Sequence, residues 1–199
     1  MFLRSERLFL RPGWAEDRDE LYAAIADPEV VCNLASAPWP YAPGDAARFL
    51  ARPAEHGLPT FLITRPDLPG APILGCIGLA HLGDGAAQRD EVELGYWIAR
   101  PHWGQGYASE AARGVLSLAR TLGHTRLVAS HFIDNPASGA VLRKAGFRPT
   151  GRLVERYSSG RGESAMALEY TLALEDGGSD GDADRGDGAG DAGTVRKAA

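Results

Sequence analysis

Residues 103–111 read Trp103-Gly104-Gln105-Gly106-Tyr107-Ala108-Ser109-Glu110-Ala111. An apolar, strand-like segment precedes this stretch, and a run with helical spacing follows it. Glycines just before a helix let a ligand approach the backbone closely, and the first helical turn offers N–H groups that have no partner within the helix. The helix dipole adds partial positive charge at the same place. The stretch therefore predicts an anion site, most typically one for phosphate.

Two common phosphate-binding patterns fit this stretch poorly. The dinucleotide fingerprint needs Gly-x-Gly-x-x-Gly/Ala directly after a strand, with an acidic residue about twenty positions later. Here Ser109 fills the last position, residues 100–103 separate the strand from the first glycine, and no suitably placed acid occurs before Asp134. The Gly-x-x-x-x-Gly-Lys-Ser/Thr pattern is absent from the sequence. A nicotinamide-dependent oxidoreductase and a nucleoside triphosphatase are therefore both disfavoured.

The composition predicts one folded domain with a tail. The 199 residues are 44% hydrophobic and 24% charged, as in ordinary globular proteins. Residues 175–199 hold seven acidic and three basic side chains, so most of the net charge of −5 lies there. The remaining chain is nearly neutral and shows no basic face for nucleic acid. We expect a domain over residues 1–174 and a disordered, acidic, Gly/Asp-rich tail over 175–199.

The sequence also indicates a compartment and the absence of a metal. No apolar run reaches the roughly 18 residues that span a bilayer, and charged residues interrupt the N-terminal segment, where a signal peptide needs an apolar core. We therefore expect a cytoplasmic protein without a membrane partner. Cys32, Cys76 and the five histidines show neither disulfide nor metal spacing, so we expect small buried cysteines and no metal site.

Hydrophobic periodicity predicts an α+β domain. A strand–helix–strand unit over 91–133 requires one parallel strand pair, while short connections allow the other strands to pair antiparallel. The result is a mixed sheet of about six or seven strands with helices on both faces. The predicted strands cover 8–11, 60–64, 73–82, 91–99, 126–133, 147–154 and 166–174, and the predicted helices cover 14–26, 28–34, 45–52, 104–122 and 135–146.

These segments resemble the GCN5-related N-acetyltransferase (GNAT) family, in particular its ribosomal-protein N-terminal acetyltransferases. The family signature Gln/Arg-x-x-Gly-x-Gly/Ala lies between a strand and a helix, and residues 103–108 match it at Gly106 and Ala108. Trp103 departs from the first position, which removes one side-chain contact near the pyrophosphate and leaves the backbone cradle intact. Segments 5–11, 26–30, 40–41, 93–98 and 135–147 are also similar to that branch, in the right order, so the resemblance covers residues 3–174.

The resemblance implies the acyl-CoA N-acyltransferase fold and acetyl-CoA as cosubstrate. Family members splay the strand before the signature with a bulge, so that the pantetheine arm pairs with its backbone and an N–H near Trp97 or Ile98 faces the oxyanion. Asn135 would cap a helix and bond pantetheine, and Lys144 would either meet a phosphate or stay solvated. The implied cofactor-binding residues are Trp97, Ile98, Ala99, Trp103, Gly104, Gln105, Gly106, Tyr107, Ala108, Ser109, Asn135 and Lys144.

Acetyl transfer to an amine needs a proton acceptor, an oxyanion donor and an acid for the departing thiolate. An alkyl ammonium group has a pKa near about 10, so the acceptor must lose a proton before it attacks. Chemistry and resemblance together favour Glu93 as the base, with Glu91 on the same strand face as the weaker alternative. Ser138 is the implied acid, and Tyr107 is a second candidate for that role.

The acceptor is less well defined. Trp39 and Tyr41, with Phe49, either line its pocket or serve as core residues. The expected acceptor is a protein N-terminal α-amine or a small-molecule amine, and the protein is expected to be a monomer or a homodimer. A non-catalytic acyl-CoA-binding regulator is the alternative function. The presence of both Glu93 and Ser138 favours the enzyme, because binding alone needs neither.

Overall fold

The computed structural model describes residues 1–53, 57–82 and 91–174, so the expected tail lies outside the described residues. The described strands form one eight-stranded sheet in the order β1-β2-β3-β4-β5-β6-β8-β7. This is slightly more than expected, because a short N-terminal strand adds an edge. The strands are β1 (Leu3–Arg4), β2 (Phe9–Arg11), β3 (Thr60–Thr64), β4 (Ile73–His81), β5 (Val92–Ile98), β6 (Arg126–Phe132), β7 (Arg148–Ser158) and β8 (Glu163–Ala173).

The helices follow the predicted order with two informative differences. They are η1 (Ala15–Asp17), α1 (Arg18–Ile25), α2 (Pro28–Val31), α3 (Pro43–Leu50), η3 (Arg100–His102), α4 (Tyr107–Thr121) and α5 (Pro136–Lys144). The helix predicted from residue 104 begins only at Tyr107, because Gly106 adopts a left-handed conformation with φ 82°. The last two strands are longer than predicted, because their antiparallel pairing continues to Ser158 and Glu163.

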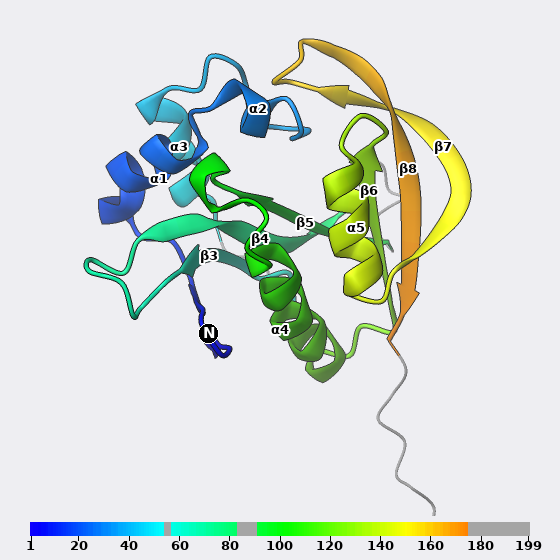
Figure 1. Cartoon of the computed structure of the whole chain (residues 1–199), viewed down its shortest axis with the longest axis horizontal. Coiled ribbons are helices and arrows are strands. Elements are labelled where there is room, and N and C mark those ends of the chain that lie inside the picture. The colour runs from blue at the N-terminus through cyan, green and yellow to red at the C-terminus, as the bar shows by residue number, and fades with distance from the viewer. Residues whose placement is uncertain (54–56, 83–90, 175–199) are drawn as a thin grey trace, which may run out of the picture.

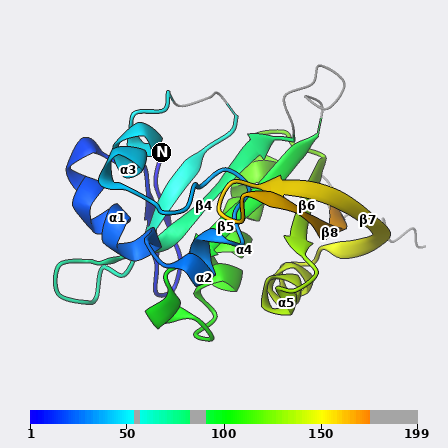
Figure 2. The same ribbon diagram turned by 90° about the horizontal axis from the view of Figure 1, so that it is seen from above.

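The sheet carries a hydrophobic core on each face. One core packs β2 to β6 against α4 and includes Leu10, Ile77, Val115 and Leu127, all fully buried. The other core lies under α1, α2 and α3 and includes Leu21 and Val31. Figure 2 shows α3 and α5 on opposite sides of the sheet. None of the described helices is long and apolar enough to cross a membrane.

The sheet opens between β5 and β6. These two strands form the parallel pair that the strand–helix–strand unit predicts, but they share a single register pair, Glu93 with Val128. On its other side β5 pairs with β4 in unbroken register from Val92 to Ile98. The expected bulge is therefore absent from the β4 side of this strand, and the splay is on the β6 side. In Figure 1, β5 and β6 diverge behind α4 and α5.

Candidate active site

The glycine loop, residues 103–106, is shaped for a ligand that contacts backbone. Gly104 and Gly106 have φ values of 73° and 82°, which side chains other than glycine rarely adopt. Glu110 N–H donates to Gly106 C=O at 3.0 Å, so the amides of the three preceding helical residues lie before the bonding ladder of α4. No described heavy atom lies within 4 Å of a Cβ built on Gly104. The loop therefore offers free amides and open space, which fits a pyrophosphate.

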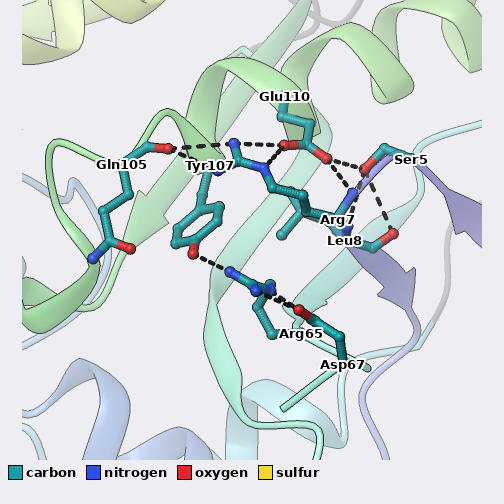
Figure 3. Close-up of polar contacts among 8 residues, drawn as sticks. All are labelled: Ser5, Arg7, Leu8, Arg65, Asp67, Gln105, Tyr107 and Glu110. Atoms are coloured by element: carbon teal, nitrogen blue, oxygen red, sulfur yellow. Dashed lines mark hydrogen bonds and ion pairs between the residues drawn. The ribbon is translucent and has the colours of Figure 1, made fainter.

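A buried carboxylate fastens this loop to the N-terminal strands (Figure 3). Glu110 Oε1 accepts hydrogen bonds from Ser5 Oγ at 2.6 Å and from Arg7 N–H at 2.8 Å, and its Oε2 accepts from Arg7 Nε at 2.8 Å. Burial by itself would raise the pKa of Glu110, but the hydrogen bonds from Ser5 and Arg7 outweigh it and hold the pKa below its ordinary value. We call Ser5, Arg7 and Glu110 the N-terminal clamp.

The clamp reaches the loop itself through Arg7. Its two terminal nitrogens donate to Gln105 C=O at 3.2 and 3.3 Å, and its guanidinium lies 4.7 Å from the ring centre of Tyr107. Tyr107 is buried, and its hydroxyl accepts a hydrogen bond from Arg65, which also pairs with Asp67. The Tyr107 hydroxyl is therefore bonded to Arg65, the residue that directly follows β3.

Trp103 closes the end of β5. Its indole Nε1–H donates to Ile98 C=O at 2.6 Å, while its side chain stays partly exposed. Ala99 N–H donates to Leu74 C=O on the β4 side, and backbone groups alternate sides along an antiparallel strand. The Trp97 amide therefore faces β4, and the Ile98 amide faces the gap toward β6. Of the two predicted oxyanion donors, only Ile98 has its N–H on the open side.

A cleft of about 480 Å³ lies over β4 and β5, on the face of the sheet that α1 and α3 cover. Its floor is made of three cross-strand pairs, which are Cys76 with Trp97, Gly78 with Gly95, and Ala80 with Glu93. Gly95 has no described heavy atom within 4 Å of a built Cβ, so the middle of the floor is open. Tyr41 lines the cleft and is buried, whereas Trp39 is exposed and is not among the residues that line it.

Glu93 lies at one end of this cleft and is held in place from two further strands. Its Oε1 accepts from Ser130 Oγ at 3.0 Å, and both carboxylate oxygens accept from Arg156 Nη1, at 2.9 and 3.1 Å. The carboxylate side chain keeps 22% of its surface exposed. Glu91, the weaker alternative, pairs instead with Arg126 at 3.4 Å and does not line the cleft.

Ser138 and its neighbours begin α5 beside the gap. Asn135 Oδ1 accepts from Ser138 N–H at 3.2 Å, which confirms the predicted helix cap. Tyr96 projects from β5 toward the same turn, with its hydroxyl 2.8 Å from Ser138 Oγ and 3.0 Å from the Ser138 carbonyl. Burial raises the pKa of Tyr96 to about 12, so the phenol keeps its proton near neutral pH. Lys144 is exposed in the last turn of α5.

The two cysteines, both expected to be buried, differ in exposure, because Cys32 is only partly buried. Cys32 and Cys76 are free thiols; Cys76 is buried, and burial raises the pKa of its thiol to about 12. Among the residues that the structure describes, no group of three or more His, Cys, Asp or Glu side chains could hold a metal ion.

Comparison with known proteins identifies the family. A family model described as an acetyltransferase (GNAT) domain matches residues 7–148, so the chain belongs to the GNAT family. The uncharacterized N-acetyltransferase YoaA of Bacillus subtilis is 32% identical over 157 residues, which make up 76% of this chain and 85% of YoaA. Family and relatives agree with the resemblance in the sequence: the protein is an N-acetyltransferase.

Solved structures confirm the fold. A GNAT-family acetyltransferase from Bacillus anthracis has a TM-score of 0.72 at 20% identity, covering 87% of this chain and 99% of that one. RimL, a ribosomal L7/L12 α-N-protein acetyltransferase solved in complex with coenzyme A, has a TM-score of 0.69 at 18% identity, covering 88% and 99%. The acyl-CoA N-acyltransferase architecture expected from the sequence is therefore correct.

Sequence reasoning missed the residues that hold the site together. It assigned no role to Arg7, Glu110, Tyr96 or Arg156, although the structure places each against a predicted site residue or loop. Two of them carried a signal. Glu110 is an acid in the first turn of a helix, and strand alternation puts Tyr96 on the face opposite Glu93. Arg156 carried no such signal, because its partner Glu93 is distant in sequence.

Proposed function

We propose that this protein transfers an acetyl group from acetyl-CoA to a primary amine by direct attack within a ternary complex. The observation that carries the proposal is the position of β5. One edge of this strand faces the gap that ends at the glycine loop, and one of its faces forms the floor of the cleft that contains Glu93. A donor in the gap and an acceptor in the cleft would therefore meet across one strand.

The donor side fits the pyrophosphate and pantetheine of acetyl-CoA. The amides that open α4, together with the glycine loop, would hold the pyrophosphate. The Ile98 amide and the side chain of Asn135 would form hydrogen bonds with the thioester arm along the gap. Lys144, on α5, would contact a phosphate of CoA. When bound, acetyl-CoA supplies the thioester carbonyl that the amine attacks.

The chain's own residues account for the proton transfers. Glu93 would take the proton from the ammonium group, directly or through a water, which frees the nitrogen to attack the carbonyl carbon. The Ile98 N–H would stabilise the oxyanion. As the new C–N bond forms and the C–S bond breaks, Ser138 would give its proton to the thiolate. The second proton that the nitrogen loses would return to Ser138 through water, and Glu93 would release its proton to bulk water. Tyr96, whose hydroxyl lies 2.8 Å from Ser138 Oγ, would hold the serine in position.

Thermal unfolding with acetyl-CoA, CoA, NADH and ATP tests the proposal. A ligand at about 100 times its Kd adds roughly 2.7 kcal/mol to the free energy of unfolding, which a melting curve detects easily. We expect stabilisation by acetyl-CoA and CoA alone, followed by thiol release when primary amines are added. No shift with either CoA species, or a shift only with NADH, would overturn the proposal.

A further inference from the structure

The acceptor cleft has two chemically different ends. Glu93 lies opposite Ala80 on β4, while Tyr41 and the charged residues of α3 lie near Cys76, four residues earlier on the same strand. Arg52 belongs to this second end, because its positive charge lowers the pKa of both Tyr41 and Cys76 against the larger effect of burial. Four residues of strand separate the two ends by roughly 13 Å along the floor.

Most charges in and around the cleft are already paired. Asp45 accepts a hydrogen bond from Ala42 N–H at 2.8 Å and pairs with Arg48. Glu93 pairs with Arg156. Arg52 lines the cleft, lies 5.5 Å over the ring of Phe49, and has no carboxylate partner among the described residues. Among the residues that the structure describes, the end of the cleft away from Glu93 therefore carries one positive charge without a carboxylate partner.

We propose that Arg52 selects acceptors that carry an anionic group on the same molecule as the primary amine, as in a peptide with an acidic residue near its N-terminus. This inference rests on the proposed function, because it takes Glu93 as the end where the amine reacts. A guanidinium group binds carboxylates through two parallel hydrogen bonds, and Arg52 is the cleft arginine whose carboxylate partner is missing from the described residues.

The geometry of the cleft indicates where the acidic group must lie. With the amine at Glu93, an anion bound by Arg52 would lie roughly 7–10 Å from it, because an arginine side chain can span part of the roughly 13 Å between the two ends. An extended peptide advances about 3.3 Å per residue, so an acidic side chain at the second or third position meets this distance. The α-carboxylate of a free amino acid is too close to its own amine to reach both ends. The open floor at Gly95 leaves room for the peptide backbone.

A peptide series tests the selection directly. We would measure acetyl-CoA-dependent thiol release with three hexapeptides that differ only in carrying Glu, Gln or Lys at the third position. For the unmodified enzyme we expect kcat/KM about threefold to fivefold higher for Glu than for Gln, since exposed charge pairs are weak. Added NaCl should reduce this ratio. Arg52→Gln should bring it close to one, and Arg52→Glu should favour the Lys peptide.

A matched variant separates the local effect from a change in net charge. Arg113 is exposed on α4, outside the cleft, so Arg113→Gln removes one positive charge and should keep the preference for Glu. Equal turnover of the three peptides, or a preference that survives Arg52→Gln, overturns the role of Arg52. Stabilisation by acetyl-CoA without turnover of any peptide overturns the acidic-peptide acceptor alone. Absence of stabilisation by acetyl-CoA overturns the proposed function itself.

Discussion

The glycine loop and the acceptor cleft share β5, but the chain holds them in place by different means. The N-terminal clamp holds the loop by hydrogen bonds. In it, the buried carboxylate of Glu110 on α4 binds Ser5 and Arg7, between β1 and β2, and Arg7 binds the loop. The cleft has a glycine pair in the middle of its floor, the buried Tyr41 and charged side chains at one end. The side that would bind the common cosubstrate is held by several hydrogen bonds, and the side that would bind the acceptor is open. The difference indicates that specificity for the acceptor resides in a few side chains.

Glu93 is the proposed base in the cleft, and its loss should have the largest effect. We expect Glu93→Gln to lower kcat about 10²–10³-fold, because it removes the proposed proton acceptor while preserving the shape of the side chain. The KM for acetyl-CoA should change little, because the carboxylate lies in the cleft and outside the loop. Steady-state thiol release over a range of pH values checks both quantities.

Glu91→Gln is the matched control for this change. Glu91 directly precedes β5 and pairs with Arg126, outside the cleft, so turnover by Glu91→Gln should equal that of the unmodified enzyme. If Glu93→Gln kept normal turnover at every pH, the assignment of Glu93 as the base would be wrong, and no residue of the cleft would have a catalytic role.

The clamp should affect the donor side selectively. Glu110→Gln replaces the buried carboxylate with an amide, which can accept on one side only and leaves a donor of Arg7 or Ser5 without its partner. We expect about 1–3 kcal/mol lower unfolding free energy and about a tenfold higher KM for acetyl-CoA, with kcat at saturation less affected. Thermal unfolding and the separate KM values for donor and acceptor measure these effects.

A conservative change distinguishes positioning from simple stability. Arg7→Lys keeps the charge but cannot bond Glu110 and Gln105 together, so it should raise the KM for acetyl-CoA with a smaller loss of stability. Equal changes in the KM of donor and acceptor would show that the clamp supports the whole fold, with no particular effect on the loop.

The pair of Tyr96 and Ser138 should have an intermediate effect. If Ser138 protonates the thiolate, Ser138→Ala should lower kcat about tenfold and leave the Kd for acetyl-CoA nearly unchanged. Tyr96→Phe should reproduce part of this loss, because it removes the hydroxyl 2.8 Å from Ser138 Oγ. Single-turnover kinetics with a pre-bound donor measures the chemical step. Unchanged kcat in Ser138→Ala would remove this serine from the mechanism.

The sequence predicted the local features of this site better than its long-range contacts. Periodicity located every main strand and helix, and two glycines before an amphipathic helix were enough to predict the loop. Alternation along β5 correctly put Glu93 and Trp97 on one face. The partner of Glu93 could not be predicted in this way, because Arg156 is 63 residues away and meets it only after β7 and β8 pair and curve around the sheet.

The clamp shows the same limit. Ser5 and Arg7 lie 105 and 103 residues from Glu110, and nothing local in the sequence indicates that they share hydrogen bonds with it. The cleft was predicted only in part, since Tyr41 and Phe49 line it and Trp39 does not. Trp39 and Tyr41 are neighbours in a proline-rich loop, yet one is exposed and the other buried, because burial depends on which side of the loop packs against α1 and α3.

The smallest expected effects concern the pH dependence of stability. The pKa shifts in the two regions have opposite directions. The pKa of Glu110 is lowered in the folded protein, so this group contributes stability above its unfolded pKa of about 4.5 and loses it as the pH falls through the folded value. Burial raises the pKa of Tyr41 to about 12, so this phenol contributes stability below its unfolded pKa of about 10 and loses it as the pH rises from 10 to 12.

Unfolding by urea at a series of pH values would resolve the two contributions. The stability difference between the unmodified protein and Glu110→Gln should be constant from pH 7 to 5 and shrink below about 4.5, while the difference to Tyr41→Phe should be constant near neutral pH and change only above about 10. Acid would then loosen the donor loop first, and alkali the acceptor cleft. If both variants responded over the same pH range, the two regions would not be stabilised independently, and the contrast between a clamped loop and an open cleft would fail.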